Sequence, residues 1–216
     1  QITMKYAMLF MEECDEMIHR LAESIAYFYG KNANYSNDKI EVCTYGLELI
    51  ISDLIVFLIA ILVSIITKTF IDTILLLGTF ILLRHQLGGF HASSHFRCNI
   101  IFFIAYILAV IAIKYIPPEI IKYLVIIIGV FSEVIAFIYA PVEHPNRPIS
   151  ERKKVKFKKT GVILLSLFWI VSIALTILFS GIESYALSII LGIFYVSISI
   201  VSEFYRQYYR NLLKSK

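Results

Sequence analysis

Six stretches of mostly apolar residues, separated by short polar segments, constrain this chain more than any other feature. A helix satisfies its own backbone hydrogen bonds, so about 20 apolar residues in helical form cross a hydrocarbon layer about 30 Å thick. The composition agrees, because 59% of the residues are hydrophobic and only 17% are charged. The sequence therefore predicts an all-α integral membrane protein with about six transmembrane helices. The predicted spans are residues 46–66, 70–83, 100–116, 120–140, 161–180 and 185–201.

The Lys and Arg residues near the span ends predict the orientation, because such residues stay on the cytoplasmic side of a membrane. With the N-terminus inside, only Lys68, Lys114 and Lys122 of the 20 Lys and Arg residues fall on the outer side. We therefore expect both termini in the cytoplasm. The net charge of +4 then needs no nucleic acid partner to explain it.

Residues 1–45 are expected to form a cytoplasmic amphipathic region, and residues 46–216 a six-span domain with a basic cytoplasmic loop at residues 141–160. Within the first region, apolar residues recur at helical spacing opposite an acidic face. Helices that lie on membranes usually carry a basic polar face, so we expect this one to pack against the protein or a partner. Its apolar stripe is Cys14, Ile18, Leu21, Ile25 and Phe28.

Three acidic residues, Asp53, Asp72 and Glu133, fall inside the predicted spans. A charge in lipid is costly, so we expect them to face the bundle interior or an aqueous cavity. A structural hydrogen bond between helices explains each one equally well. The other interpretation is functional: these carboxylates serve a membrane transporter of a small peptide or ion.

A polar segment, RHQLGGFHASSHFRC at residues 84–98, connects the short second span to the third. It holds three histidines, two arginines, a glycine pair and one cysteine. A thiolate is a nucleophile, and an imidazole close to a thiol can take up its proton. The segment is therefore a candidate catalytic element on the cytoplasmic side between spans 2 and 3.

Two histidines compete as the partner of Cys98. In one continuous helix the Cα atoms of His91 and Cys98 would be about 10.5 Å apart, whereas His95 precedes Cys98 by three residues. A chain that folds back after Gly88-Gly89 favours His91. Two other interpretations stay open: a zinc site whose three ligands are His91, His95 and Cys98 on one helical face, or a basic loop that meets lipid phosphates.

The pattern of Arg84, Gly88-Gly89-Phe90-His91-Ala92 and Cys98 resembles the signature of the AgrB family, the membrane cysteine endopeptidases of bacterial peptide quorum sensing. The later stretch APVEHPNRP at residues 140–148, followed by a lysine-rich run, is similar to that family's loop between spans four and five. The likeness extends to chain length, span count and the order of both motifs. It implies a multi-pass protein of the bacterial plasma membrane that processes a precursor peptide of the AgrD type without a cofactor.

The resemblance also implies a reaction and its residues. Cys98 is the nucleophile that attacks the carbonyl group at the junction with the precursor's acidic tail, and His91 is the general base. The precursor's own cysteine then displaces the enzyme from the thioester and closes a thiolactone ring. Arg84 and Gly89 match positions that the family needs; we interpret Arg84 as an anchor and Gly88-Gly89 as a source of backbone freedom.

Further roles are hypotheses drawn from the chemistry. The backbone N–H of Cys98 and the side-chain amide of Gln86 are candidate donors to the oxyanion, and Ser93, Glu133 and Glu143 are candidates for orienting His91. The basic run at residues 152–159, which includes Lys153 and Lys154, is expected to contact anionic lipid or to attract the acidic tail of the precursor. The sequence leaves open whether the chain forms a homodimer.

Overall fold

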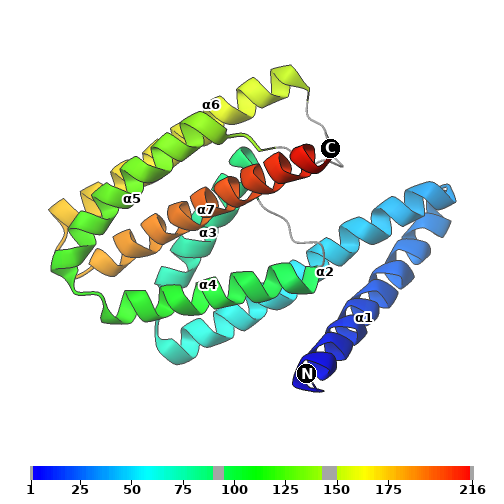
Figure 1. Ribbon diagram of the computed structural model, residues 1–216. Coiled ribbons are helices and arrows are strands. Elements are labelled where there is room, and N and C mark those ends of the chain that lie inside the picture. The colour runs from blue at the N-terminus through cyan, green and yellow to red at the C-terminus, as the bar shows by residue number, and fades with distance from the viewer. Residues whose placement is uncertain (1, 90–94, 143–149, 215–216) are drawn as a thin grey trace. The chain divides into compact units, whose positions relative to one another are not determined.

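The computed structural model describes residues 2–89, 95–142 and 150–214, and seven helices account for almost all of them (Figure 1). Six helices are long and apolar enough to cross a membrane; in α4 and α7 the stretches that qualify are Cys98–Tyr115 and Glu183–Arg210. The prediction of an all-α integral membrane protein is confirmed. The helices are α1 (Ile2–Asn32), α2 (Asn37–Thr67), α3 (Phe70–Leu87), α4 (His95–Tyr115), α5 (Pro118–Tyr139), α6 (Glu151–Leu178) and α7 (Glu183–Lys214).

The helix boundaries follow from local chemistry. Pro118 occupies the first position of α5, where its fixed φ is suited to a helix and its missing N–H costs nothing. α3 continues past Leu83, the predicted end of the second span, and stops at Leu87 because Gly88 has φ 76° and ψ −160°. The short second span thus gains its length from the polar residues that follow it.

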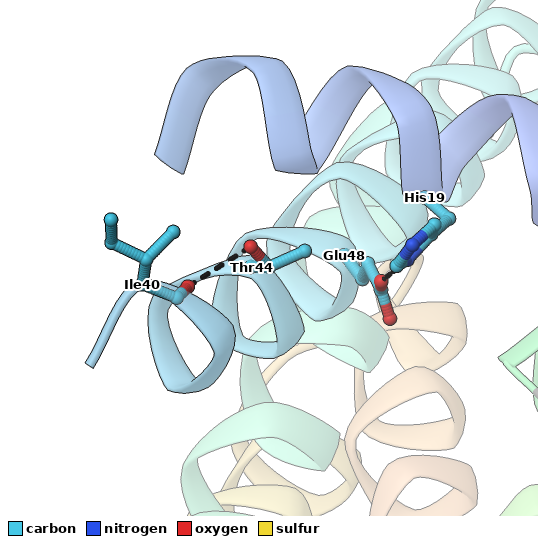
Figure 2. A network of polar contacts seen from close by, with 4 residues as sticks. All are labelled: His19, Ile40, Thr44 and Glu48. Atoms are coloured by element: carbon cyan, nitrogen blue, oxygen red, sulfur yellow. Dashed lines mark hydrogen bonds and ion pairs between the residues drawn. The ribbon is translucent and has the colours of Figure 1, made fainter. Parts of the chain in front are cut away.

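The chain divides into two compact units, residues 1–63 with 92–104 and residues 64–91 with 105–216. In the first unit, α1 packs against the N-terminal half of α2. Figure 2 shows part of this contact, in which His19 of α1 forms a hydrogen bond with Glu48 of α2. Within α2, Thr44 donates to the Ile40 carbonyl oxygen at 3.0 Å. Gly30 lies close against the side chain of Ile40. The first unit is therefore held by an α1–α2 hairpin together with the start of α4.

The contact face of α1 differs from the predicted one. Ala22 and Ala26 are buried, whereas Leu21 and Phe28 of the expected apolar stripe are 52% and 64% exposed. Small residues let two helix backbones approach closely, and α1 uses Ala22, Ala26 and Gly30 for this purpose. The prediction that α1 packs against the protein is confirmed, but the prediction of the face is wrong for Leu21 and Phe28. The side chain of Cys14 lies outside the described residues.

In the second unit α7 is the central helix and packs against α3, α5 and α6 (Figure 1). The contacts between α7 and α3 follow in the same order along both helices. Ser188 donates to Asp72 at 3.1 Å, Gly192 lies against Leu76 and Thr79, and Ser199 lies against Gly89. Positions along both helices increase together, so α3 and α7 run parallel. This packing holds the C-terminal end of α3 firmly, and that end begins the polar segment at residues 84–98.

The three acidic residues of the spans have different environments. Asp72 is buried, with 7% exposure, and accepts its hydrogen bond from Ser188. Glu133 accepts a hydrogen bond from Ser166 at 2.6 Å. Asp53 is exposed on α2, so of the two expected settings, the bundle interior and an aqueous cavity, it does not occupy the first. The neighbouring Ser52, and not Asp53, is the residue that α2 buries at this level.

Candidate functional site

The end of α3 carries the first residues of the predicted catalytic segment. The guanidinium group of Arg84 lies over the Phe80 ring, 5.4 Å from its centroid. The carbonyl oxygen of Arg84 accepts a hydrogen bond from the Gly88 N–H at 3.0 Å, which closes the last turn of the helix. Arg84 is therefore placed both by a cation–π contact and by its own backbone at the point where the helix stops.

Gly88 and Gly89 occupy backbone conformations that other residues rarely adopt, with φ of 76° and 149°. A side chain at Gly88 would collide with the carbonyl oxygen of Val142, and one at Gly89 would collide with the hydroxyl of Ser199. Glycine is therefore required at both positions for two reasons: the backbone conformation and the close approach of a neighbouring atom. After Leu87 the chain departs from the helix, as the predicted fold-back requires.

The two motifs of the sequence meet at Gly88. Val142 forms an isolated parallel bridge with Gly88, and its N–H donates to the Leu87 carbonyl oxygen at 3.1 Å. The peptide bond between Ala140 and Pro141 is cis. The start of the APVEHPNRP stretch is therefore attached to the candidate catalytic segment, a contact that the spacing of the two motifs did not predict.

The end of the basic run also lies near this junction, because α6 packs on the end of α3. The ring of His85 contacts the Phe157 ring edge to face, with centroids 6.5 Å apart, and Gly161 lies against Leu87 and Gln86. Gln86 is half-buried in this contact. Its side chain is thereby placed beside α6 at the end of α3.

The lysines of the run are in different environments. Lys154 pairs with Glu151 at 2.6 Å, and Lys158 lies over the Phe137 ring at 5.4 Å. Lys153, Lys156 and Lys159 are exposed. The exposed lysines are therefore better placed than Lys154 to meet an anionic partner.

Cys98 is the fourth residue of α4 and is half-buried, with a free thiol. The positive end of the helix dipole favours negative charge in such a first turn. His91, Ser93 and Glu143 lie outside the described residues, as does the side chain of His95. The pairing of Cys98 with His91 thus stays a prediction. The carboxylate of Glu133, one of the candidates for orienting His91, accepts a hydrogen bond from Ser166.

One polar contact beside Cys98 was not predicted from the sequence. The Asn99 side-chain amide donates to the Ser52 hydroxyl of α2 at 2.6 Å, and the same nitrogen lies 3.5 Å from the Ser52 carbonyl oxygen. The only available signal was the presence of two polar residues within or next to predicted spans, and nothing in their spacing connects residue 52 to residue 99.

These features define a class: a multi-pass α-helical membrane protein with a free cysteine at the beginning of one span and a glycine junction between two polar motifs. The sequence model of the family described as Accessory gene regulator B matches residues 22–200. This chain belongs to the AgrB family, and membership supports a role in accessory gene regulator quorum sensing.

Individual relatives agree with the family match. A putative AgrB-like protein of Clostridium perfringens (strain SM101 / Type A) is 30% identical over 188 residues, which cover 82% of this chain and 88% of the relative. The accessory gene regulator protein B of Staphylococcus saprophyticus is 27% identical over 154 residues, covering 71% and 77%. No solved structure matches the chain significantly.

Proposed function

We propose that this protein is a membrane-embedded cysteine endopeptidase that removes the C-terminal tail of a short AgrD-type precursor and promotes closure of a thiolactone ring. Family membership carries the proposal. The junction between the two motifs supports it, because the bridge from Gly88 to Val142 brings both motifs to the same end of α3. The protein would act in the bacterial plasma membrane, with the segment at residues 84–98 and both termini on the cytoplasmic side.

In the first step His91 accepts the thiol proton of Cys98, and the sulfur attacks the carbonyl carbon that joins the precursor's central segment to its tail. The C–N bond breaks, the leaving nitrogen takes the proton from His91, and an acyl thioester on Cys98 remains. In the second step the precursor's own thiol attacks the thioester carbonyl. Cys98 leaves as the thiol, and the ring closes.

The site must exclude water between these steps. Exchange of one thioester for another is nearly balanced in energy, whereas hydrolysis runs downhill, so water would divert the intermediate to a linear product. Cys98 is half-buried at the beginning of a span, a position that limits access to bulk water. The exposed Lys153 and its basic neighbours would attract the acidic tail and raise the rate of capture.

The alternative of transport has less support. Asp72 and Glu133, two of the carboxylates on which a transporter would depend, each accept a hydrogen bond from a serine of a neighbouring helix. Such pairs are sufficient to explain acidic residues in a helix bundle. We therefore expect Asp72→Asn to retain peptide processing, whereas a transporter would lose its activity.

The proposal is tested with purified protein in lipid vesicles and a synthetic precursor that has an internal cysteine and an acidic tail. Mass spectrometry reports the released tail and the cyclic product. Cys98→Ser should abolish tail release, and Cys43→Ser, which removes a half-buried free cysteine from α2, is the matched control and should cleave normally. Equal losses in both variants would contradict the proposed nucleophile.

A further inference from the structure

Asn99 connects the first turns of α4 to α2 by a hydrogen bond. Its amide nitrogen is 2.6 Å from the Ser52 hydroxyl, and Ser52 is only 2% exposed. A buried hydroxyl has few other partners to exchange with, so its bond to the half-buried Asn99 amide favours one arrangement of the two helices.

A second contact lies along the same α2–α4 interface, which is called the seam below. The rings of Phe57 and Phe102 lie edge to face, with centroids 6.4 Å apart and planes at 89°. Ser52 and Phe57 are on α2, and Asn99 and Phe102 are three residues apart on α4, so both α4 residues lie on one face of that helix. Positions on α2 and α4 increase together along the seam, and the two helices run parallel within the first unit.

This seam determines the direction in which Cys98 points. Successive residues of a helix are rotated by about 100°, so Cys98 lies about 100° around α4 from Asn99. Cys98 is four residues before Phe102 and lies only about 40° around α4 from it, at the edge of the same face, which agrees with its partial burial. Cys98 comes only four residues into the helix, and Asn99 is the contact closest to it in sequence along this seam.

We propose that Asn99 and Ser52 are a positioning pair that sets the rotation of the first turns of α4 and, with it, the direction of the Cys98 sulfur. The proposal rests on the proposed role of Cys98 as the nucleophile. With a helix radius of about 5 Å including side chains, a rotation of about 15° moves a side-chain atom by about 1.3 Å. A misplacement of about 1 Å can cost roughly 10²-fold in rate.

The test is a double-mutant cycle on the full-length protein in lipid vesicles, with Ser52→Ala, Asn99→Ala and the double variant. We expect each single substitution to lower kcat for tail release by roughly 10- to 100-fold, with KM nearly unchanged. The double variant should be no slower than the slower single variant, because either substitution already breaks the pair. Ser52→Ala removes only one oxygen atom, so it keeps the test valid even if Asn99→Ala disturbs folding.

Two further measurements separate positioning from general stability. Thr44→Ala is the matched control, because Thr44 is also a buried hydroxyl residue of α2 but bonds only to the Ile40 carbonyl oxygen of its own helix among the contacts described. It should cleave at the normal rate. The exchanged variant Ser52→Asn with Asn99→Ser recreates the bond with its partners swapped and should recover part of the kcat that the single variants lose. The rate of Cys98 alkylation by a neutral reagent should recover with it.

The outcomes distinguish this inference from the function on which it rests. Tail release by Cys98→Ser would overturn the proposed nucleophile, and the positioning role would fall with it. If Cys98 is essential, three results would overturn the positioning pair alone: kcat of Ser52→Ala within twofold of normal, losses that multiply in the double variant, or an equal loss in Thr44→Ala.

Discussion

Replacing Gly88 by alanine tests whether the junction between the two motifs is needed for activity. The φ of 76° and ψ of −160° at Gly88 belong to a region that only glycine adopts readily, so alanine there costs about 1–3 kcal/mol in backbone strain. The new methyl group would also collide with the Val142 carbonyl oxygen. Separation of the two bridged segments then loses the hydrogen bond from Val142 to Leu87, worth about 1 kcal/mol.

The backbone strain and the lost hydrogen bond together come to about 2–4 kcal/mol. This lowers the population of the intact junction by roughly 30- to 1,000-fold if the rest of the fold does not compensate. We expect Gly88→Ala to lose tail release by a factor in this range. Gly78→Ala is the control on the same helix: an added methyl group there meets no atom within 4 Å, and alanine is a better helix former than glycine. It should keep full activity and unfold at the same or a higher temperature.

The assay measures tail release by mass spectrometry and thermal unfolding of both variants in the same detergent. A Gly88→Ala protein that cleaves within twofold of the parent would refute the idea that the junction organises the site. If Gly88→Ala and Gly78→Ala lost activity equally, the loss would reflect crowding or stiffening of α3 and not the junction.

Three other predictions concern the general base, the basic run and the N-terminal hairpin. His91→Ala should lower tail release by roughly 10² to 10⁴ and change the pH profile of Cys98 alkylation; a larger effect of His95→Ala would transfer the role of base to that residue. Lys153→Glu should weaken precursor capture at low salt and have little effect at high salt, and a salt-independent KM would argue against steering. The hydrogen bond to Glu48 raises the pKa of His19 above its usual 6.5, so the stabilisation of the hairpin should be fully present below pH 6.5 and be lost as the pH rises through the raised pKa. Hydrogen exchange of α1 should show this loss in the parent and not in a His19→Gln variant.

Much of the fold could be predicted from the sequence because the signals are local. Spans of apolar residues, the proline pair at residues 117–118 and the helical spacing of the first region each depend on a few neighbouring positions. The candidate nucleophile and base also come from a local signal, since Cys98 and three histidines fall within 15 consecutive residues of a chain otherwise poor in such groups, and these roles stay a prediction.

The sequence alone could not predict which faces meet. Hydrophobicity marked Leu21 and Phe28 as the contact face of α1, yet the smaller Ala22 and Ala26 are the buried residues. Small residues let α1 approach α2 closely, and a pattern of hydrophobicity does not report this. Within the spans, lipid is as apolar as the protein interior, so hydrophobicity also could not show that α2 buries Ser52 and leaves Asp53 exposed.

The sequence by itself therefore determined the class of protein and the number of helices able to span a membrane, and it supplied the candidate site residues. Only the tertiary structure decided that Gly88 lies against Val142, 54 residues later in the chain, and that Ser52 holds the residue next to Cys98. Both contacts join segments far apart in sequence, and each depends on a backbone conformation or a helix rotation that many other residues set together. Such contacts are products of packing, which no local pattern encodes.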